Sequence, residues 1–280
     1  QDPQIVILDE PTSSLSDHEI DNLFEIILRM QKKGITFIYI SHRMEEIKRI
    51  GNSGTVLRDG KFVASIDDVK SMDMEQIIKL IVGRSLEEQY PARESHIGDV
   101  LLDVQGLSVK GLIEDVSFQV RRGEVLGFSG LVGAGRTTTA KAVFGALKKS
   151  VGRIFIDGKE VRIRSPHDAI RNGISLLPEN RKEEGLILTK SIAWNLVFAS
   201  LHKYKCGPFL NERKEYQDVA QYRDMLSIKA PSLERQIKYL SGGNQQKVVF
   251  AKWLCAESKI YFFDEPTRGI DVGAKSEMYK

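Results

Sequence analysis

Two pairs of adjacent acids are placed where they could bind a ligand. Asp9–Glu10 and Asp264–Glu265 each follow a run of four apolar residues. A short apolar run that ends at a turn signal predicts a fully buried strand of a parallel sheet. Acids at the carboxyl end of such a strand lie where open α/β sheets bind ligands, although a strand can also simply end at a charged turn.

The acid pairs belong to a repeated segment. Residues 8–13 read LDEPTS and residues 263–268 read FDEPTR, so Asp264 follows Asp9 by 255 residues. Self-similarity at a fixed period indicates duplicated units, and this period is the size of one large domain. The period nearly equals the chain length of 280 residues, and the chain opens on Gln1 rather than Met. We therefore expect a fragment that begins within a first domain.

A glycine-rich segment between the acid pairs predicts a phosphate-binding loop. Residues 123–145 read GEVLGFSGLVGAGRTTTAKAVFG, an apolar strand that leads into glycines and then into a helical pattern. This order matches the P-loop, G-x-x-x-x-G-K-[ST], whose glycines let backbone N–H groups approach phosphate oxygens. The Thr137 hydroxyl would bind Mg²⁺. Arg136 stands where the pattern has lysine and keeps the charge but not the geometry, so binding should survive better than catalysis.

A third motif, Ser-Gly-Gly-Asn at 241–244, begins a long helical pattern in YLSGGNQQKVVFAKWLCAES (239–258). Small residues at a helix start expose several N–H groups, which can bind an anion. The same residues also fit a plain serine N-cap that binds no ligand.

Together these motifs resemble those of an ABC-type ATPase. LSGGNQQK is similar to the family's signature motif, FFDEPTRGID to its Walker B motif with the D-loop, and GLVGAGRTT to its Walker A motif. GITFIYISHR (34–43) is similar to its switch-histidine loop. PENRKEEGL (178–186) and RGIDVGAK (268–275) resemble the second half of the double-domain ATPases that drive bacterial monosaccharide importers, and YISHRMEEI (39–47) resembles their first half.

The resemblance implies ATP and Mg²⁺ as cofactors and a role for each motif residue. It implies that Asp9 and Asp264 hold Mg²⁺, that Glu10 and Glu265 orient or deprotonate the attacking water, and that His42 senses the γ-phosphate. The residues implied to bind the nucleotide are Gly130, Gly133, Ala134, Gly135, Arg136, Thr137, Thr138, Glu179, Ser241, Gly242, Gly243 and Asp271. In the family, two domains pair head to tail, and each ATP lies between the P-loop of one domain and the signature of the other.

The second copy departs from the family pattern at more than Arg136. Glu179 stands at the place of a loop glutamine, where an acid brings more negative charge near the nucleotide. Residues 108–115 hold no aromatic side chain to stack on adenine. In the first copy, Ser16 takes the place of the D-loop aspartate. We expect the site of Glu10 to hydrolyse ATP and the second site mainly to bind it.

The expected fold class is α/β: a P-loop ABC-type nucleotide-binding domain with a helical subdomain, preceded by the C-terminal part of a first such domain. We assign residues 1–83 to the first domain, 84–99 to a polar linker and 100–280 to the second domain, without its C-terminal end. The expected elements are helices at 18–33 and 74–84, a strand at 35–40, a hairpin at 55–65, strands from about 101 into the P-loop, and the helical subdomain at 186–235.

Composition narrows the class of partner. The chain is 41% hydrophobic and 28% charged with a formal net charge of +3, which argues against a dedicated nucleic-acid surface. No apolar run approaches the ~18 residues of a membrane span. The resemblance implies transmembrane permease subunits as partners, a periplasmic or extracellular solute-binding protein indirectly, and a peripheral place at the cytoplasmic face of the cell membrane. Two alternatives remain open: a soluble tandem ABC ATPase acting on ribosomes or nucleic acid, and a nucleotide-binding regulatory module without turnover.

Overall fold

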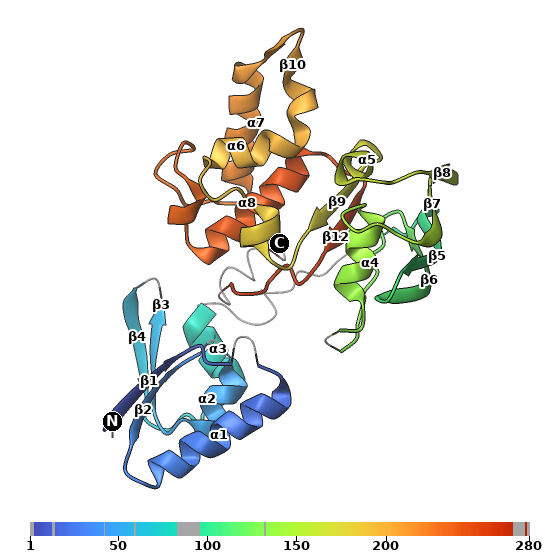
Figure 1. The fold of residues 1–280 in the computed structure, drawn as a ribbon. Coiled ribbons are helices and arrows are strands. Elements are labelled where there is room, and N and C mark those ends of the chain that lie inside the picture. The colour runs from blue at the N-terminus through green and yellow to red at the C-terminus, as the bar shows by residue number, and fades with distance from the viewer. Residues whose placement is uncertain are drawn as a thin grey trace. The chain divides into compact units, whose positions relative to one another are not determined.

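The computed structural model describes residues 3–12, 15–41, 43–58, 60–82, 96–131, 133–270 and 278. Three of the features named above, His42, Asp271 and most of the predicted linker (84–95), lie outside the described residues. The described residues form two compact units (Figure 1). One contains the described residues up to Val82 together with Gly269, Ile270 and Met278, and the other contains residues 96–268.

The first unit contains a parallel pair of strands with a helix packed on one face. β1 (Ile5–Asp9) pairs with β2 (Thr36–Ile40), and α1 (Asp17–Gln31) connects them (Figure 1). A capping interaction begins the helix, because the Glu19 carboxylate accepts hydrogen bonds from Ser16 N at 2.8 Å and Ser16 Oγ at 2.7 Å. The predicted strand at 35–40 and helix at 18–33 are confirmed within two residues at each end.

A hairpin and two further helices complete the first unit. α2 (Met44–Ile50) leads into the antiparallel strands β3 (Gly54–Arg58) and β4 (Lys61–Ile66), which form the predicted hairpin. α3 (Met74–Val82) begins where the sequence predicts. These elements share a small buried core of Met44, Val56, Ile66, Val69 and Ile77.

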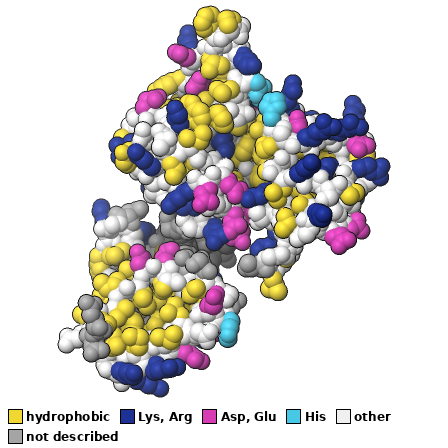
Figure 2. Space-filling view, in the orientation of Figure 1, with side chains coloured by type: hydrophobic (Ala, Val, Ile, Leu, Met, Phe, Trp, Pro, Cys, Tyr) yellow, Lys and Arg dark blue, Asp and Glu magenta, His cyan; other side chains and the backbone are white. Residues whose placement is uncertain are grey.

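The prediction of a fully buried β1 is wrong, because only one face of this strand pair is covered. Leu8, Phe37 and Tyr39 pack against the buried Phe24 of α1 and its neighbours. On the opposite face, Ile5, Ile7, Ile38 and Ile40 are 61%, 64%, 49% and 47% exposed. Figure 2 shows hydrophobic side chains gathered on the surface of the first unit. In the part of the first unit that the structure describes, no element covers that face.

The second unit combines an antiparallel sheet with a parallel strand pair and a helical part. β5 (Val100–Val109), β6 (Ile113–Arg121), β7 (Val151–Ile156) and β8 (Lys159–Val161) form the sheet in the order β6-β5-β7-β8. β9 (Ile174–Leu177) and β12 (Ile260–Phe263) form the parallel pair. α4 (Arg136–Val143) and α5 (Pro166–Arg171) belong to the same α/β part of the unit (Figure 1).

The helical part follows β9 in the chain, as predicted. Its elements, in chain order, are a π-helical turn η1 (Arg181–Gly185), α6 (Ile192–Val197), a 3-10 segment η2 (Phe198–Tyr204), the short hairpin β10 (Lys205–Cys206) and β11 (Phe209–Leu210), α7 (Glu212–Met225), a 3-10 turn η3 (Ile237–Tyr239) and α8 (Gly242–Cys255). One continuous core joins both parts, since Leu102 and Ile154 of the sheet belong to the same buried cluster as Leu196 and Val248 of the helices.

The predicted strand before the glycine-rich loop is not formed. Residues 124–130 make no strand pairing with any residue that the structure describes. Val125 is 75% exposed, while Phe128 packs edge-on against Phe118 of β6 with ring centroids 5.0 Å apart. An apolar segment becomes a strand only where a neighbouring strand accepts its hydrogen bonds, and the described residues contribute none here.

Candidate nucleotide site

The glycine-rich loop ends in a backbone conformation that only glycine adopts readily. Gly135 is the N-cap of α4 with φ of 89°, and Gly133 has φ of 85°. A Cβ at Gly135 would lie 2.5 Å from Ile113 Cγ2, so β6 approaches the loop too closely for any side chain. The loop therefore brings backbone N–H groups to the start of an eight-residue helix, which is the arrangement that binds phosphate.

The three threonines that follow differ in their surroundings. Thr139 is buried, and its Oγ1 donates to the Gly135 carbonyl at 2.9 Å, so this hydroxyl serves the helix itself. Thr137 and Thr138 lie half-buried in the first turn of α4. The hydroxyls of Thr137 and Thr138, unlike that of Thr139, are therefore the ones suited to bind a metal ion and a phosphate.

The second acid pair lies at the end of β12 and faces the loop. The N–H of Asp264 donates to the Leu177 carbonyl at 3.0 Å, which continues the pairing with β9 by one residue. Arg136 Nη2 lies 3.6 Å from Glu265 Oε1, so the start of α4 and the end of β12 meet in space. The structure thus brings together Arg136 and Glu265, two of the residues that the sequence predicts for one site.

Arg268 adds a positive charge that the sequence analysis missed. It forms an ion pair with Glu179, which follows β9 by two residues, and lies 4.0 Å from Glu265 Oε2. The sequence predicts that Glu179 brings more negative charge near the nucleotide, and in the structure Arg268 offsets part of that charge. One difference between the repeats could have pointed to Arg268, because the second repeat has arginine there and the first has serine at the matching position 13.

The glutamate of the first acid pair has the same backbone φ as that of the second. Asp9 ends β1, and the N–H of Glu10 donates to the Ile40 carbonyl at 2.9 Å. Glu10 and Glu265 both have φ of 44°, a left-handed conformation that is uncommon for residues other than glycine. The repeat of the sequence is therefore also a repeat of backbone conformation, and strained residues of this kind cluster at functional sites.

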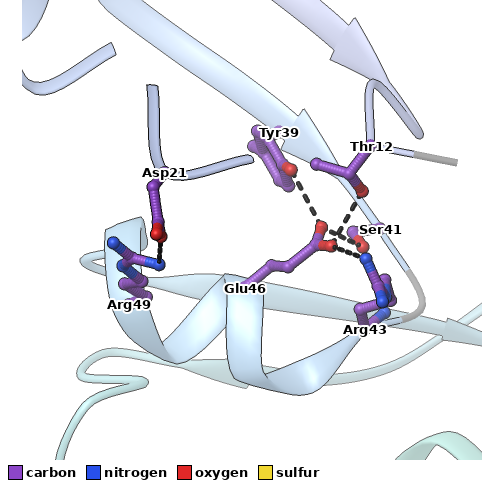
Figure 3. A network of polar contacts seen from close by, with 7 residues as sticks. All are labelled: Thr12, Asp21, Tyr39, Ser41, Arg43, Glu46 and Arg49. Atoms are coloured by element: carbon purple, nitrogen blue, oxygen red, sulfur yellow. Dashed lines mark hydrogen bonds and ion pairs between the residues drawn. The ribbon is translucent and has the colours of Figure 1, made fainter. Parts of the chain in front are cut away.

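A buried carboxylate, Glu46, connects the turn after β1 with the end of β2 (Figure 3). Glu46 of α2 accepts hydrogen bonds from four side chains that belong to the turns after β1 and β2 or to β2 itself, namely Thr12, Tyr39, Ser41 and Arg43. Glu46 cannot be recognised from the sequence, because a glutamate in a short helix gives no signal of its own.

The signature segment forms the start of α8, as predicted. Ser241 is the N-cap, and its Oγ accepts from the N–H of Asn244. Two side chains of α8 donate hydrogen bonds to backbone carbonyls elsewhere in the second unit. Gln246 Nε2 donates to the Pro266 carbonyl at 2.8 Å, just after the second acid pair, and Lys252 Nζ donates to the Gly185 carbonyl at 2.7 Å. The helix is thus connected to the turn after the second acid pair and to η1.

The donor set fits magnesium held together with a nucleotide. Mg²⁺ is bound through one or two protein oxygens plus substrate phosphates and water. Thr137 and Asp264 offer a hydroxyl and a carboxylate of that kind. No cluster of three or more His, Cys, Asp or Glu side chains occurs among the residues that the structure describes, so the described residues contain no all-protein metal site.

Comparisons with known proteins agree with these motifs. A family model for the ABC transporter matches residues 113–268. The ribose import ATP-binding protein RbsA of Bacillus cereus is 48% identical over 98% of this chain and 56% of its own length. The putative ribose/galactose/methyl galactoside import ATP-binding protein 1 of Agrobacterium fabrum is 47% identical over 100% of this chain and 55% of its own length. The chain thus spans about half the length of the curated relatives it matches.

Solved structures show the same fold at lower identity. The ATP-binding cassette MJ0796, in a dimeric post-hydrolysis state bound to ADP and Pi, superposes with a TM-score of 0.54 at 18% identity, over 64% of this chain and 79% of the other. CbiO1 of Clostridium perfringens, part of an ABC transporter complex, gives 0.52 at 24% identity, over 64% and 71%. Because the family model covers more than half of the residues and the fold agrees, this chain belongs to the ABC transporter family.

Proposed function

We propose that this chain binds and hydrolyses Mg-ATP as part of the ATPase that powers import of a simple sugar through a membrane permease. The observation that carries the proposal is the approach of Arg136, at the start of α4, to Glu265, at the end of β12. It supports a phosphate-binding helix start beside an acid pair, which is the arrangement that binds Mg-ATP. We assign most of the hydrolysis to the repeated acid pair at Glu10. The names of the relatives, which specify ribose and galactose import, support a simple sugar as the imported solute.

The roles within the second site follow from this geometry. The loop residues Gly130, Gly133, Ala134, Gly135 and Thr138 bind phosphate through backbone and hydroxyl groups, and Arg136 adds charge. Thr137 and Asp264 hold Mg²⁺, which neutralises charge on the phosphates when bound. Glu265 orients the attacking water, and Glu179, paired with Arg268, lies at the edge of the site.

The first site requires a partner domain. We propose that Asp9 holds Mg²⁺ and Glu10 acts as the base, with His42 at the γ-phosphate, and that Ser241, Gly242 and Gly243 close this site by head-to-tail pairing of nucleotide-binding domains. Asp271 would lie at the same domain contact. Dimerisation of the related cassette in its ADP and Pi state supports such pairing.

The proposed place of the protein is peripheral, at the cytoplasmic face of the membrane. No helix that the structure describes is long and apolar enough to cross a bilayer. Permease subunits would supply the membrane spans, and a solute-binding protein would deliver the sugar to them. Reconstitution of the full-length protein with its permease tests this directly. ATP-dependent uptake of labelled ribose or galactose supports the proposal. A rate of ATP hydrolysis that is the same with and without the permease contradicts it.

Nucleotide binding by the loop is tested with two matched glycines. Gly135→Ala places a Cβ against Ile113 and forces a left-handed alanine, so we expect it to abolish ATP binding to this chain. Gly158→Ala imposes a comparable backbone conformation, φ of 73°, in the open turn between β7 and β8, and should leave binding unchanged. Equal losses of affinity in the two variants, measured by calorimetric titration, would show that the loop does not bind the nucleotide.

A further inference from the structure

Glu46 is a buried carboxylate with every acceptor position in use. Its side chain belongs to the first turn of α2, and the residue is 5% exposed. Oε1 accepts from Thr12 Oγ1 at 2.7 Å and from Arg43 Nη1 at 2.9 Å. Oε2 accepts from Tyr39 Oη at 2.9 Å and from Ser41 Oγ at 3.0 Å. Figure 3 shows the four donors converging on this one side chain.

These donors come from two strand ends that carry the candidate chemistry. Thr12 lies in the turn after β1, two residues beyond Glu10. Tyr39 belongs to β2, and Ser41 and Arg43 belong to the turn that follows it. Ser41 Oγ also accepts from the N–H of Arg43 at 3.0 Å, which fixes that turn internally. A single carboxylate thus connects the turn of Glu10 with the turn after the neighbouring strand.

The charge state of Glu46 favours such a connection. Burial raises the pKa of Glu46, but hydrogen bonds from Thr12, Tyr39, Ser41 and Arg43 together outweigh burial and hold the pKa below its usual value. The side chain is therefore an anion at neutral pH. Hydrogen bonds to an ionised acceptor are about twice as strong as those between neutral groups, and a buried network that loses one member leaves the others unsatisfied.

We propose that Glu46 is a positioning residue for hydrolysis at the site of Glu10. It holds the turn after β1 against the turn after β2, so the Glu10 carboxylate keeps one position relative to the neighbouring strand end. The inference rests on the proposed function, because it requires Glu10 to act on ATP. Glu46 itself touches no reacting atom.

The sharpest test removes one hydrogen bond while keeping the shape. Thr12→Val in the full-length protein, assayed with its permease, retains the volume of a side chain that is 3% exposed and loses the donor to Glu46. We expect kcat for ATP hydrolysis to fall about tenfold to a hundredfold, since a displacement of about 1 Å can cost 10²-fold. KM for ATP should stay within about twofold of its normal value. Thr12→Ser, which keeps the hydroxyl, should retain normal turnover.

Coupling and a matched control separate positioning from general stability. If Thr12 acts through Glu46, then Glu46→Gln should lower kcat in the same way, and the double variant should be no slower than Glu46→Gln alone. The control is Asp21→Asn, which removes the exposed ion pair between Asp21 and Arg49 (Figure 3). Arg49 lies on α2, as Glu46 does, and this variant should change neither kcat nor KM.

The outcomes distinguish this inference from the proposed function. A wild-type protein without any ATP turnover would overturn the proposed function and the inference with it. An active wild type whose Thr12→Val variant keeps its kcat, or loses only thermal stability or ATP affinity, would overturn the inference alone. Additive losses in the double variant would show that the two residues do not act through one contact.

Discussion

At the scale of single residues, the two acid pairs share a backbone conformation as well as their amino-acid types. Glu10 and Glu265 hold the same left-handed φ of 44°, and such a conformation costs of order 1–3 kcal/mol for a residue with a side chain. The repeated sequence predicts that the two glutamates have equivalent roles. It does not predict their backbone conformation, which the structure shows just beyond the ends of β1 and β12.

The pairing of Arg268 with Glu179 makes a prediction about charge at the second site. Arg268→Gln leaves Glu179 without its cation beside the nucleotide, so we expect ATP to bind this chain about threefold to tenfold more weakly. Adding Glu179→Gln removes the repulsion and should restore the affinity. Calorimetric titration of the single and double variants measures both effects.

The control for this prediction is another exposed ion pair of the same unit. Arg122→Gln removes the pairing with Asp157, which lies in the turn between β7 and β8, and should leave ATP affinity unchanged. If Arg268→Gln binds ATP normally, or if Glu179→Gln weakens binding further in that background, Glu179 does not face the nucleotide.

The buried amine of Lys252 predicts a pH dependence of stability. Burial lowers the pKa of Lys252 to about 8, while an unfolded lysine titrates near 10.4. Between these values the unfolded chain binds a proton that the folded chain has lost, so the free energy of unfolding rises with pH. Relative to Lys252→Met, the wild type should gain about 1–3 kcal/mol between pH 8 and 10. Urea unfolding of both proteins measures the difference, and parallel pH profiles would contradict the assignment.

At the scale of elements, the sequence correctly predicts the helices and strands whose stabilising contacts lie nearby in the chain. The helix at 18–33 carries its own cap at Ser16, and the hairpin at 55–65 pairs with itself, so both are found as expected. Residues 124–130 have the apolar pattern of a strand, but a strand depends on a neighbour that the pattern does not contain. The prediction that β1 is fully buried is wrong for the same reason, because the covering of a strand face depends on the whole sheet.

The uncovered face of the β1–β2 pair makes a prediction that compares adjacent residues. Ile7→Thr changes a side chain that is 64% exposed and should alter the free energy of unfolding of this chain by less than about 0.5 kcal/mol. It should also reduce binding of a hydrophobic dye. Leu8→Thr changes a side chain packed on α1 and should cost about 1–3 kcal/mol. Equal costs in urea unfolding would show that both faces of the strand pair are covered in solution.

At the scale of the whole molecule, the two repeats are alike in their acids and different around them. The second site has Arg136 in the loop and Glu179 beside it, with Arg268 compensating the added charge. In the first unit, the Glu46 network includes Thr12, which lies two residues beyond Glu10. The Ser241–Gly243 segment, which we propose closes that site by domain pairing, keeps the family sequence. The motifs and their order were readable from the sequence, because each motif is local. Arg268 and Glu46 were not, because their importance depends on contacts between distant segments.

The central claim is that the site of Glu10 hydrolyses ATP while the second site mainly binds it. The most direct measurement is the ATPase rate of Glu10→Gln and Glu265→Gln in the full-length protein, in membranes that carry the permease. General-base catalysis contributes roughly 10²–10⁴ in rate, so Glu10→Gln should nearly abolish hydrolysis. Glu265→Gln should cost far less. Equal losses in the two variants, or a larger loss at Glu265, would contradict the account.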